Sequence, residues 1–303
     1  MNLLKLWTNP YKIYNFLATK GVYCKFLSDK SYLQKRYRAH FGKKLNLVDP
    51  QTFNAKLQWL KLYDRKPIYT TMVDKYAVKE YVAAQIGEEY IIPTLGLWER
   101  FDDIDFDALP DQFVLKCTHD SGGLVICRDK SKFDRAAAKA KIEKFLKREF
   151  YWMHREWPYK NVKPRIIAEQ YISDNDEGEL SDYKIHCFNG VPKFILVCQD
   201  RFKTSGLTED FYSVTWERLE VKRPARPNAR ISIKRPENLE EMLELSQKLA
   251  VNMPFARIDF YIVNGKVYWG EITFYPASGF SAFEPEEWDY TFGSWIQLPE
   301  KTI

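Results

Sequence analysis

Two carboxylates, an arginine and a threonine alternate with apolar residues near the end of this 303-residue chain. Arg257 and Asp259 are spaced to share one face of a β-strand, and Glu271 and Thr273 are spaced in the same way on a second strand. The turn pair Asn264-Gly265 lies between the two runs, so the stretch is predicted to be a β-hairpin. Two carboxylates on one face repel each other unless a cation lies between them, which suggests a Mg²⁺ site.

The register of this hairpin decides whether the two carboxylates meet. A two-residue turn pairs Asp259 with Gly270 and places Glu271 on the opposite face. A three-residue turn ending in a left-handed Gly265 pairs Arg257 with Glu271 and aligns the carboxylates, and a bulge elsewhere in the ladder also aligns them. In the alternative interpretation, Asp259 pairs with Arg257 or a lysine on a solvated sheet face. The spacing alone leaves these alternatives open.

A second candidate group follows the apolar run Phe113–Leu115. Lys116 ends that run, and the polar turn after it contains Ser121-Gly122-Gly123 before the apolar run Leu124–Cys127. One interpretation is a hairpin whose turn needs glycine for positive φ, and because Gly-Gly turns are common the stretch alone favours it. The other is a phosphate-binding loop, in which glycines expose backbone N–H groups beside a cation. Within this turn, His119 either orients a substrate or is simply a polar turn residue.

The elements that must position these residues are a mixture of helices and strands. Apolar periodicity predicts helices at 53–62, 72–84, 134–148 and 237–250, the third of them capped by Asp134. Strands are predicted at 113–115, 124–127, 166–172, 183–188, 192–199, 211–218, 256–263 and 266–274. Because helices and strands do not alternate regularly, the pattern predicts an α+β fold of one or two domains.

Charge is distributed unevenly along the chain. Residues 1–48 carry ten basic residues and one acidic residue, a net charge of +9, whereas the remainder carries 36 basic and 40 acidic residues, a net charge of −4. The basic arm also holds apolar and aromatic residues at roughly helical spacing, which suits either contact of residues 1–40 with an anionic membrane or a helical extension packed on the main body. The mildly acidic remainder shows no recognition module, so no nucleic-acid partner is expected.

Several other classes are excluded by the sequence. No apolar run approaches the roughly 18 residues of a spanning helix, and nothing resembles a cleavable signal peptide. The cysteines lie too far apart for a zinc site, so reduced thiols in a cytoplasmic protein are expected. They are Cys24, Cys117, Cys127, Cys187 and Cys198.

Taken in order, the motifs resemble an ATP-grasp enzyme, and specifically the TupA-like ATP-grasp family found in bacterial polysaccharide gene clusters. The matching stretches are VDKYAVK at 73–79, FVLKCTHDSGG at 113–123, IIAEQYI at 166–172, DYKIHCFNG at 182–190, FARIDFY at 255–261 and GEITFYPASG at 270–279. The resemblance runs from about Asp49 to near Trp288. It implies two α+β subdomains that grip ATP between them, with a basic helical N-terminal extension.

This resemblance implies a division of the chain and a role for each candidate residue. Residues 1–48 would be the arm, 49–112 an N-terminal part, 113–172 the ATP-lid subdomain and 173–303 the metal-binding subdomain. The implied ATP contacts are Lys75, Lys116, Ser121, Gly122 and Gly123 for the phosphates, Glu169 for the adenine and ribose, and Gln170, Tyr171 and Ile172 at the hinge. Arg257 would steady the transferred phosphoryl group, and Lys184 would contact a phosphate or the acceptor. The implied metal ligands are Asp259, Glu271 and Thr273, where Thr273 replaces an asparagine common in related ligases.

The implied activity is that of a ligase using ATP and two Mg²⁺ ions. A carboxylate would be activated as an acyl-phosphate, and an amine would displace the phosphate to form an amide. The implied partners are a carboxylate-bearing glycan precursor and an amine, in the synthesis of a uronic-acid-containing capsule or cell-envelope polysaccharide. The alternatives are a sugar phosphotransferase, a non-catalytic scaffold, or a sugar-nucleotide glycosyltransferase whose Asp-x-Asp motif would be Asp103-Ile-Asp105 or Asp105-Phe-Asp107.

Overall fold

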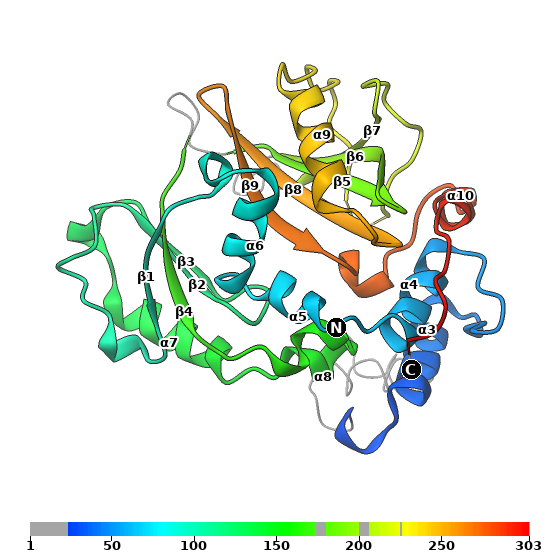
Figure 1. Cartoon of the computed structure of the whole chain (residues 1–303), viewed down its shortest axis with the longest axis horizontal. Helices are drawn as coiled ribbons and strands as arrows, with labels where there is room; N and C mark the ends of the chain where they lie inside the picture. Colours follow the sequence, from blue (N-terminus) through cyan, green and yellow to red (C-terminus); the bar gives the residue numbers. More distant parts are fainter. Residues whose placement is uncertain (1–23, 174–179, 200–205, 225, 303) are drawn as a thin grey trace.

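The computed structural model describes residues 24–173, 180–199, 206–224 and 226–302, which form helices and two antiparallel sheets (Figure 1). The helices are α3 (Asp29–Phe41), α4 (Phe53–Tyr63), α5 (Ile68–Val73), α6 (Ala77–Ile86), α7 (Arg135–Leu146), α8 (Phe150–His154), α9 (Leu239–Leu249) and α10 (Glu287–Trp295). The strands are β1 (Thr94–Trp98), β2 (Phe113–Cys117), β3 (Leu124–Cys127), β4 (Ile166–Gln170), β5 (Asp182–Phe188), β6 (Val191–Gln199), β7 (Thr208–Ser213), β8 (Phe255–Val263) and β9 (Lys266–Thr273). Short 3-10 helices include η3 (Phe101–Asp103), η5 (Trp157–Asn161) and η6 (Pro276–Gly279).

The first sheet has the order β1-β4-β2-β3 and its own apolar core with α7. In β2, Phe113, Leu115 and Cys117 are fully buried in that core. Because side chains alternate along a strand, the intervening Lys116 points to the other face of the sheet. Asp134 caps α7, as predicted, by accepting a hydrogen bond from the Ala137 N–H at 2.9 Å.

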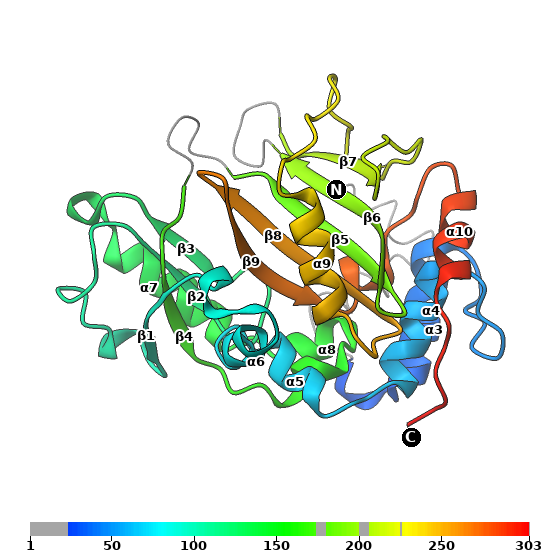
Figure 2. The same ribbon diagram turned by 45° about the horizontal axis from the view of Figure 1, so that its top comes forward.

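The second sheet has the order β7-β6-β5-β8-β9, and α9 covers one of its faces (Figure 2). In β5, Ile185 and Cys187 are fully buried, and the Cys187 thiol contacts the Ser246 carbonyl of α9. Lys184, the residue before Ile185, therefore lies on the face away from α9, together with His186. The same alternation in both sheets thus gives each sheet one face for a core and one face for polar residues.

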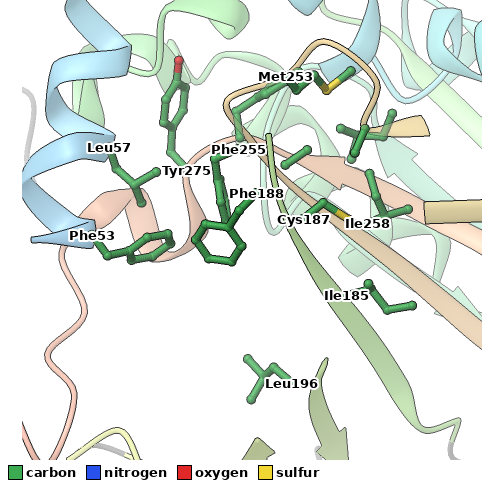
Figure 3. Close-up of a cluster of buried hydrophobic side chains, with 14 of the residues drawn as sticks. Phe53, Leu57, Ile185, Cys187, Phe188, Leu196, Met253, Phe255, Ile258 and Tyr275 are labelled. Carbon is green, nitrogen blue, oxygen red and sulfur yellow. The ribbon is translucent and has the colours of Figure 1, made fainter. Parts of the chain in front are cut away.

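Helices α3, α4 and α10 close the end of the main core. Figure 3 shows Phe53 and Leu57 of α4 beside Phe188 and Phe255 of the second sheet. The ring centroids of Phe53 and Phe255 lie 5.0 Å apart. In α3, Tyr32, Leu33 and Tyr37 are part of this core, so residues 29–41 of the basic arm are an integral part of the main body. The arm residues 1–23 lie outside the described residues.

Two predicted elements differ from the structure. The helix expected at 72–84 is broken, because the Asp74 carboxylate accepts hydrogen bonds from the N–H groups of Tyr76 and Ala77 and starts α6 there. Lys75 therefore lies in the break between α5 and α6 and not at the start of one continuous helix. The strand expected at 211–218 was also displaced, since β7 ends at Ser213, whose hydroxyl accepts the N–H groups of Thr215 and Glu217 in a tight turn.

The first sheet includes β1, which pairs with β4, and its core includes Phe101, Ile104 and Phe106, so this sheet begins before residue 113. Tyr159 of η5 packs against the main core. The division of the chain at residues 113 and 173 stays a prediction. In the described part of the chain, no helix is both long and apolar enough to cross a membrane.

Candidate active site

A cavity of about 420 Å³ lies between the two sheets and collects most of the predicted site residues. The lining residues include Lys75, Lys116, Ser121, Gly122, Gly123, Glu169, Lys184, Arg257, Asp259 and Glu271. A smaller hollow of about 160 Å³ shares Lys116 and Glu169 with it and adds Gln170, Tyr171 and Ile172. Thr273 lies on the same sheet face, opposite Arg257, but is not among the residues that line either hollow.

The two carboxylates of the last hairpin lie directly opposite each other. The turn is the two-residue type, with Val263 paired to Lys266, and that register alone would separate Asp259 from Glu271. A bulge between the Phe260–Trp269 and Asp259–Glu271 pairs restores the alignment. The third of the alternatives left open by the sequence is therefore the one that occurs.

The bulge depends on Gly270, which has no opposite residue in the ladder. A Cβ atom at this position would lie 2.9 Å from the Tyr261 ring and 3.2 Å from the Asp259 carbonyl oxygen. The close approach of the backbone and this ring leaves room only for glycine.

Cations surround the carboxylate pair. Arg257 donates from Nε to Asp259 at 2.6 Å and from Nη2 to Glu271 at 2.7 Å, so a single guanidinium bridges both carboxylates. Lys184, opposite Asp259 on β5, donates to the same carboxylate at 2.7 Å. Asp259 is buried, whereas 46% of the Glu271 side chain is accessible and faces the cavity.

The surroundings shift the pKa values of Asp259 and Glu271 in opposite directions. Burial raises the pKa of Asp259 to about 6, although Arg257 and Lys184 favour its charged form. Burial also disfavours the charge on Glu271, but Arg257, Lys184 and Lys75 outweigh it and lower the pKa to about 2. Near neutral pH both groups are therefore anionic, and their charges are balanced by those of Arg257 and Lys184.

The loop after β2 faces this pair from the other subdomain. Lys75 donates from Nζ to the Asp120 carbonyl oxygen, and its backbone N–H donates to the Thr118 carbonyl at 3.1 Å. These bonds join the break between α5 and α6 to the loop. A Cβ atom at Gly123 would lie 2.8 Å from the Cys117 sulfur and 2.9 Å from the Asp120 carboxylate. The glycine is therefore needed where the loop doubles back on β2.

Glu169 is held by two lysines. Its carboxylate lies 2.5 Å from the Lys116 Nζ on one oxygen and 2.5 Å from the Lys79 Nζ on the other. Burial alone would raise the pKa of Glu169, but Lys116 and Lys79 outweigh it and lower the pKa below its usual range. Lys79 was not predicted as a site residue. The available signal was its spacing of four residues from Lys75 within the helix expected at 72–84.

The family model for TupA-like ATP-grasp proteins matches residues 55–297, about four fifths of the sequence. The chain belongs to the TupA-like ATP-grasp family. The match confirms the family that the ordered motifs suggested, and with it the α+β ATP-grasp fold of this chain.

Solved structures similar to this TupA-like ATP-grasp chain are distant. The D-alanine–D-alanine ligase from Bacillus anthracis, solved with ATP, is 18% identical over 67% of this chain and 55% of that one, with a TM-score of 0.39. For the ligase from Helicobacter pylori the identity is 14%, over 76% and 60% of the chains, with a TM-score of 0.42. A RimK domain ATP-grasp protein from Sphaerobacter thermophilus is 11% identical, over 77% and 70%, with a TM-score of 0.41.

The chain thus spans little more than half the length of the Bacillus anthracis ligase. Likenesses at this level place no individual site residue. No curated protein matches the sequence.

Membership in an ATP-grasp family implies ATP and Mg²⁺, and the donor set is suited to Mg²⁺ bound together with phosphates. Across the described residues, no group of three or more His, Cys, Asp and Glu could hold a metal ion. Asp259 and Glu271 supply two facing carboxylates, and Asp182 of β5, which binds Lys184 at 2.9 Å, lines the same cavity. Mg²⁺ in proteins is commonly bound by one or two carboxylates plus substrate phosphates and water. These two residues therefore fit Mg²⁺ that arrives with a nucleotide.

The turn that follows β9 is held by a buried polar stripe on α4. Ala277, Ser278 and Gly279 have positive φ angles of 47°, 55° and 63°. The Lys61 Nζ donates to the Ser278 carbonyl at 2.8 Å, and the Gln58 amide donates to the Gly279 carbonyl at 2.8 Å. These two buried α4 residues fix the backbone just beyond the metal-ligand strand. No motif or spacing in the sequence indicated this role for Gln58 and Lys61.

The remaining candidates lie away from the reacting groups. His119 is buried in the loop, where its Nε2 lies 3.2 Å from the Arg148 carbonyl, and burial lowers its pKa. The Asp-x-Asp pairs lie on the surface of the first subdomain. The Asp103 carboxylate binds Arg100, and the Asp105 carboxylate accepts the N–H of Asp107 in a local turn. None of the three aspartates lines either hollow of the site.

Proposed function

We propose that this protein is an ATP- and Mg²⁺-dependent ligase that joins an amine to a carboxylate through an acyl-phosphate. The observation that carries the proposal is the arrangement of the cavity. Asp259 and Glu271 lie opposite each other under Arg257, and the same cavity is lined by Lys75, Lys116 and the glycine loop. Family membership supports the ATP-dependent chemistry.

In this mechanism the residues of the chain position phosphates and neutralise charge. The apolar hollow beside Gln170, Tyr171 and Ile172 takes the adenine, and Lys116 and the glycine loop hold the phosphates. Bound Mg²⁺ would act as a Lewis acid and neutralise charge on the phosphate oxygens. Asp259 and Glu271 would hold the metal, and Thr273 is a third candidate ligand. We expect two ions.

The bonds change in two steps. A carboxylate oxygen of the acceptor attacks the γ-phosphorus, and ADP leaves. The amine nitrogen then attacks the acyl carbon, phosphate leaves, and the nitrogen loses a proton. Arg257 faces the negative charge that develops on the transferred phosphoryl group. Lys184, opposite Asp259 on β5, contacts a phosphate or the acceptor. No protein nucleophile is required.

For the acceptor we propose a uronic-acid-containing precursor of a bacterial capsule or cell-envelope polysaccharide, and for the second substrate an amino acid or another amine. The motif-level resemblance to a family from polysaccharide gene clusters motivates this assignment. Magnesium-dependent ADP formation that requires both a uronic acid and an amine, with an amide detected by mass, would support it. A phosphorylated sugar formed without an amine would identify a phosphotransferase instead.

The first test is titration of the full chain with ATP, with and without Mg²⁺. Lys116→Ala and Glu271→Gln should each weaken Mg²⁺-dependent ATP binding by at least roughly tenfold, about 1.4 kcal/mol. Lys248→Ala and Glu244→Gln, both exposed on α9, are the matched controls and should bind as the wild type does. A folded wild type that does not bind ATP would overturn the proposal.

We also propose that the protein works in the cytoplasm, with the basic arm attached peripherally to the anionic inner face of the membrane. The net charge of +9 over residues 1–48 motivates this. Because α3 is part of the main core, the appropriate deletion removes residues 1–23 and leaves α3 intact. The deletion removes three of the ten basic residues and should weaken sedimentation with anionic liposomes, and unchanged sedimentation would contradict attachment through residues 1–23.

A further inference from the structure

A strongly basic segment follows β7. Residues 222–235, here called the basic strip, contain six basic residues and no acidic residue. They are Lys222, Arg223, Arg226, Arg230, Lys234 and Arg235. All except Arg223 are exposed, and within the described residues Arg230 and Lys234 have no ion-pair partner. Lys222, Arg223, Arg226 and Arg235 pair with three carboxylates outside the basic strip, those of Glu209, Glu240 and Glu284. Three positive charges are therefore left in excess along the basic strip, and this excess favours an anionic partner.

The described residues of the basic strip, 222–224 and 226–235, lie along the edge strand β7. The Pro227 carbonyl accepts the N–H of Glu209 at 3.0 Å, and the Ala229 N–H donates to the Asp210 carboxylate at 2.9 Å. Further along, the Ile233 N–H donates to the Tyr212 hydroxyl at 2.8 Å. These bonds hold the backbone of the basic strip against β7 and leave its long side chains directed to solvent.

The inner end of the basic strip reaches the face of the sheet that carries the catalytic residues. One row of paired residues crosses all five strands on that face: Phe211, Leu196, Lys184, Asp259 and Glu271. The Arg223 guanidinium lies 6.0 Å from the centre of the Phe211 ring and 3.3 Å from the Glu209 carboxylate. With two strand spacings between β7 and β5, the backbone of Phe211, beside Arg223, lies on the order of 10 Å from that of Lys184.

A second cavity adjoins the same end of the basic strip. It measures about 500 Å³ and lies between the α3–α4 connection and α10. Pro224 of the basic strip lines it together with Lys43, Lys44 and Phe283. The Arg223 guanidinium also lies 6.0 Å from the Phe283 ring, so Arg223 stands between the catalytic face and this cavity.

We propose that the basic strip is the docking surface for the acceptor, and that the acceptor is a polymer or oligomer bearing many carboxylates. Arg223 would receive the carboxylate nearest the reacting one, while Arg226, Arg230 and Lys234 bind carboxylates further along the chain. This inference rests on the proposed ligase function and specifies its substrate. A single small acid would need only the inner arginine, whereas charges that continue outward along β7 suit a ligand with repeated charges.

The test measures binding of a labelled decagalacturonate, a chain of ten linked uronic acids, to the full protein. The strip variant Arg226→Glu/Arg230→Glu/Lys234→Glu is compared with Lys141→Glu/Lys144→Glu/Lys147→Glu. Both variants replace three exposed basic residues and change the net charge equally, but the control residues lie on and just after α7 in the other subdomain. ATP affinity is measured for every protein and reports both folding and the nucleotide site.

We expect the wild type to bind the oligomer and to lose affinity between about 0.05 M and 0.2 M salt, because screening weakens exposed charge pairs. The strip variant should bind the oligomer at least roughly tenfold more weakly, with ATP affinity unchanged, and the control variant should stay within about twofold of the wild type. Oligomer binding by the strip variant equal to the wild type would overturn the inference, as would an equal loss in both variants.

Two further outcomes separate the inference from its alternatives. If the wild type binds ATP but not decagalacturonate, the basic strip is not a glycan surface and the ligase proposal still stands. If the strip variant loses binding only to vesicles of anionic lipid, the segment contacts membrane, and the glycan assignment is wrong. Failure of the wild type to bind ATP would instead overturn the proposed function itself.

Discussion

Asp259 lies directly across the β8–β9 ladder from Glu271, although a regular hairpin with this turn would put them on opposite faces. A single extra residue, Gly270, shifts the register by one position and brings the carboxylates under the same arginine. The geometry of the proposed metal site is therefore set by a backbone irregularity as much as by the ligands themselves.

The bulge gives the first prediction. Gly270→Ala should weaken Mg²⁺-dependent ATP binding by at least roughly tenfold, because the new methyl group would push Tyr261 or the Asp259 backbone out of place. It should also lower the free energy of unfolding by about 2 kcal/mol, as overpacking does. Gly265→Asn is the control, since no atom lies within 4 Å of a Cβ there and asparagine tolerates the left-handed conformation. Equal effects of the two changes on ATP binding would contradict this account.

The parts of the site that depend on neighbouring residues in the sequence could be predicted, and the parts that depend on distant residues could not. Strand alternation is local, so it correctly grouped Arg257 with Asp259. The relation between Asp259 and Glu271 depends on one bulge, and alternation alone could not place it. The position of Lys75 was mispredicted for a similar reason. The apolar periodicity indicates one continuous helix, but the Asp74 side chain starts a new helix just after Lys75.

Contacts between distant segments were beyond the sequence altogether. Glu169 of β4 was expected to contact the nucleotide. Its second lysine partner, Lys79, lies on α6 and was not identified from the sequence. From the sequence, Gln58 and Lys61 look like part of an ordinary polar face of α4. In the structure they bind the turn at Ser278 and Gly279, which lies 217 to 221 residues further along the chain. The apolar pattern predicted most helices and strands, whereas the partners of the buried polar groups could be identified only from the structure.

Lys79→Met provides the second prediction. Loss of one of two ammonium partners should raise the pKa of Glu169, because burial is then opposed by Lys116 alone. ATP affinity should fall by roughly fivefold at pH 8 and by more at pH 5.5, where Glu169 begins to bind a proton. Calorimetric titration at both pH values measures this, with exposed Lys248→Met as the control. A loss that is the same at both pH values would mean that Lys79 acts independently of the charge on Glu169.

The third prediction concerns the support beneath the turn after β9. The fully buried Lys61 ammonium serves three acceptors: the Gln58 side chain and the His154 and Ser278 carbonyls. Lys61→Met should lower the free energy of unfolding by about 3 kcal/mol, since it leaves buried acceptors without a donor. Lys56→Met on the same helix removes one bond, to the Ile296 carbonyl, and should cost less than about 1 kcal/mol in urea unfolding. Similar losses for both variants would show that the Lys61 contacts contribute little.

The final prediction follows from the buried histidines. Burial, followed by the charges of Lys61, Arg36 and Arg148, lowers the pKa of His154 from 6.5 to about 3. Burial likewise lowers the pKa of His186, which lies beside Arg257 on the catalytic face. Between pH 6.5 and 3 the unfolded chain binds a proton at position 154 that the folded protein does not, so these histidines make stability fall as the pH falls.

His154→Asn isolates one of these contributions. At pH 5 the wild type should have lost about 2 kcal/mol of its free energy of unfolding through His154. Over the 1.5 pH units between 6.5 and 5, this histidine is protonated in the unfolded chain but not in the folded protein. The decrease in the free energy of unfolding from pH 8 to pH 5 should therefore be smaller in the variant by about that amount. Urea unfolding across this range measures it, and pH 8 is the internal reference because histidine is neutral there in both states. A variant that keeps the wild-type pH dependence would show that the folded protein already carries the proton on His154.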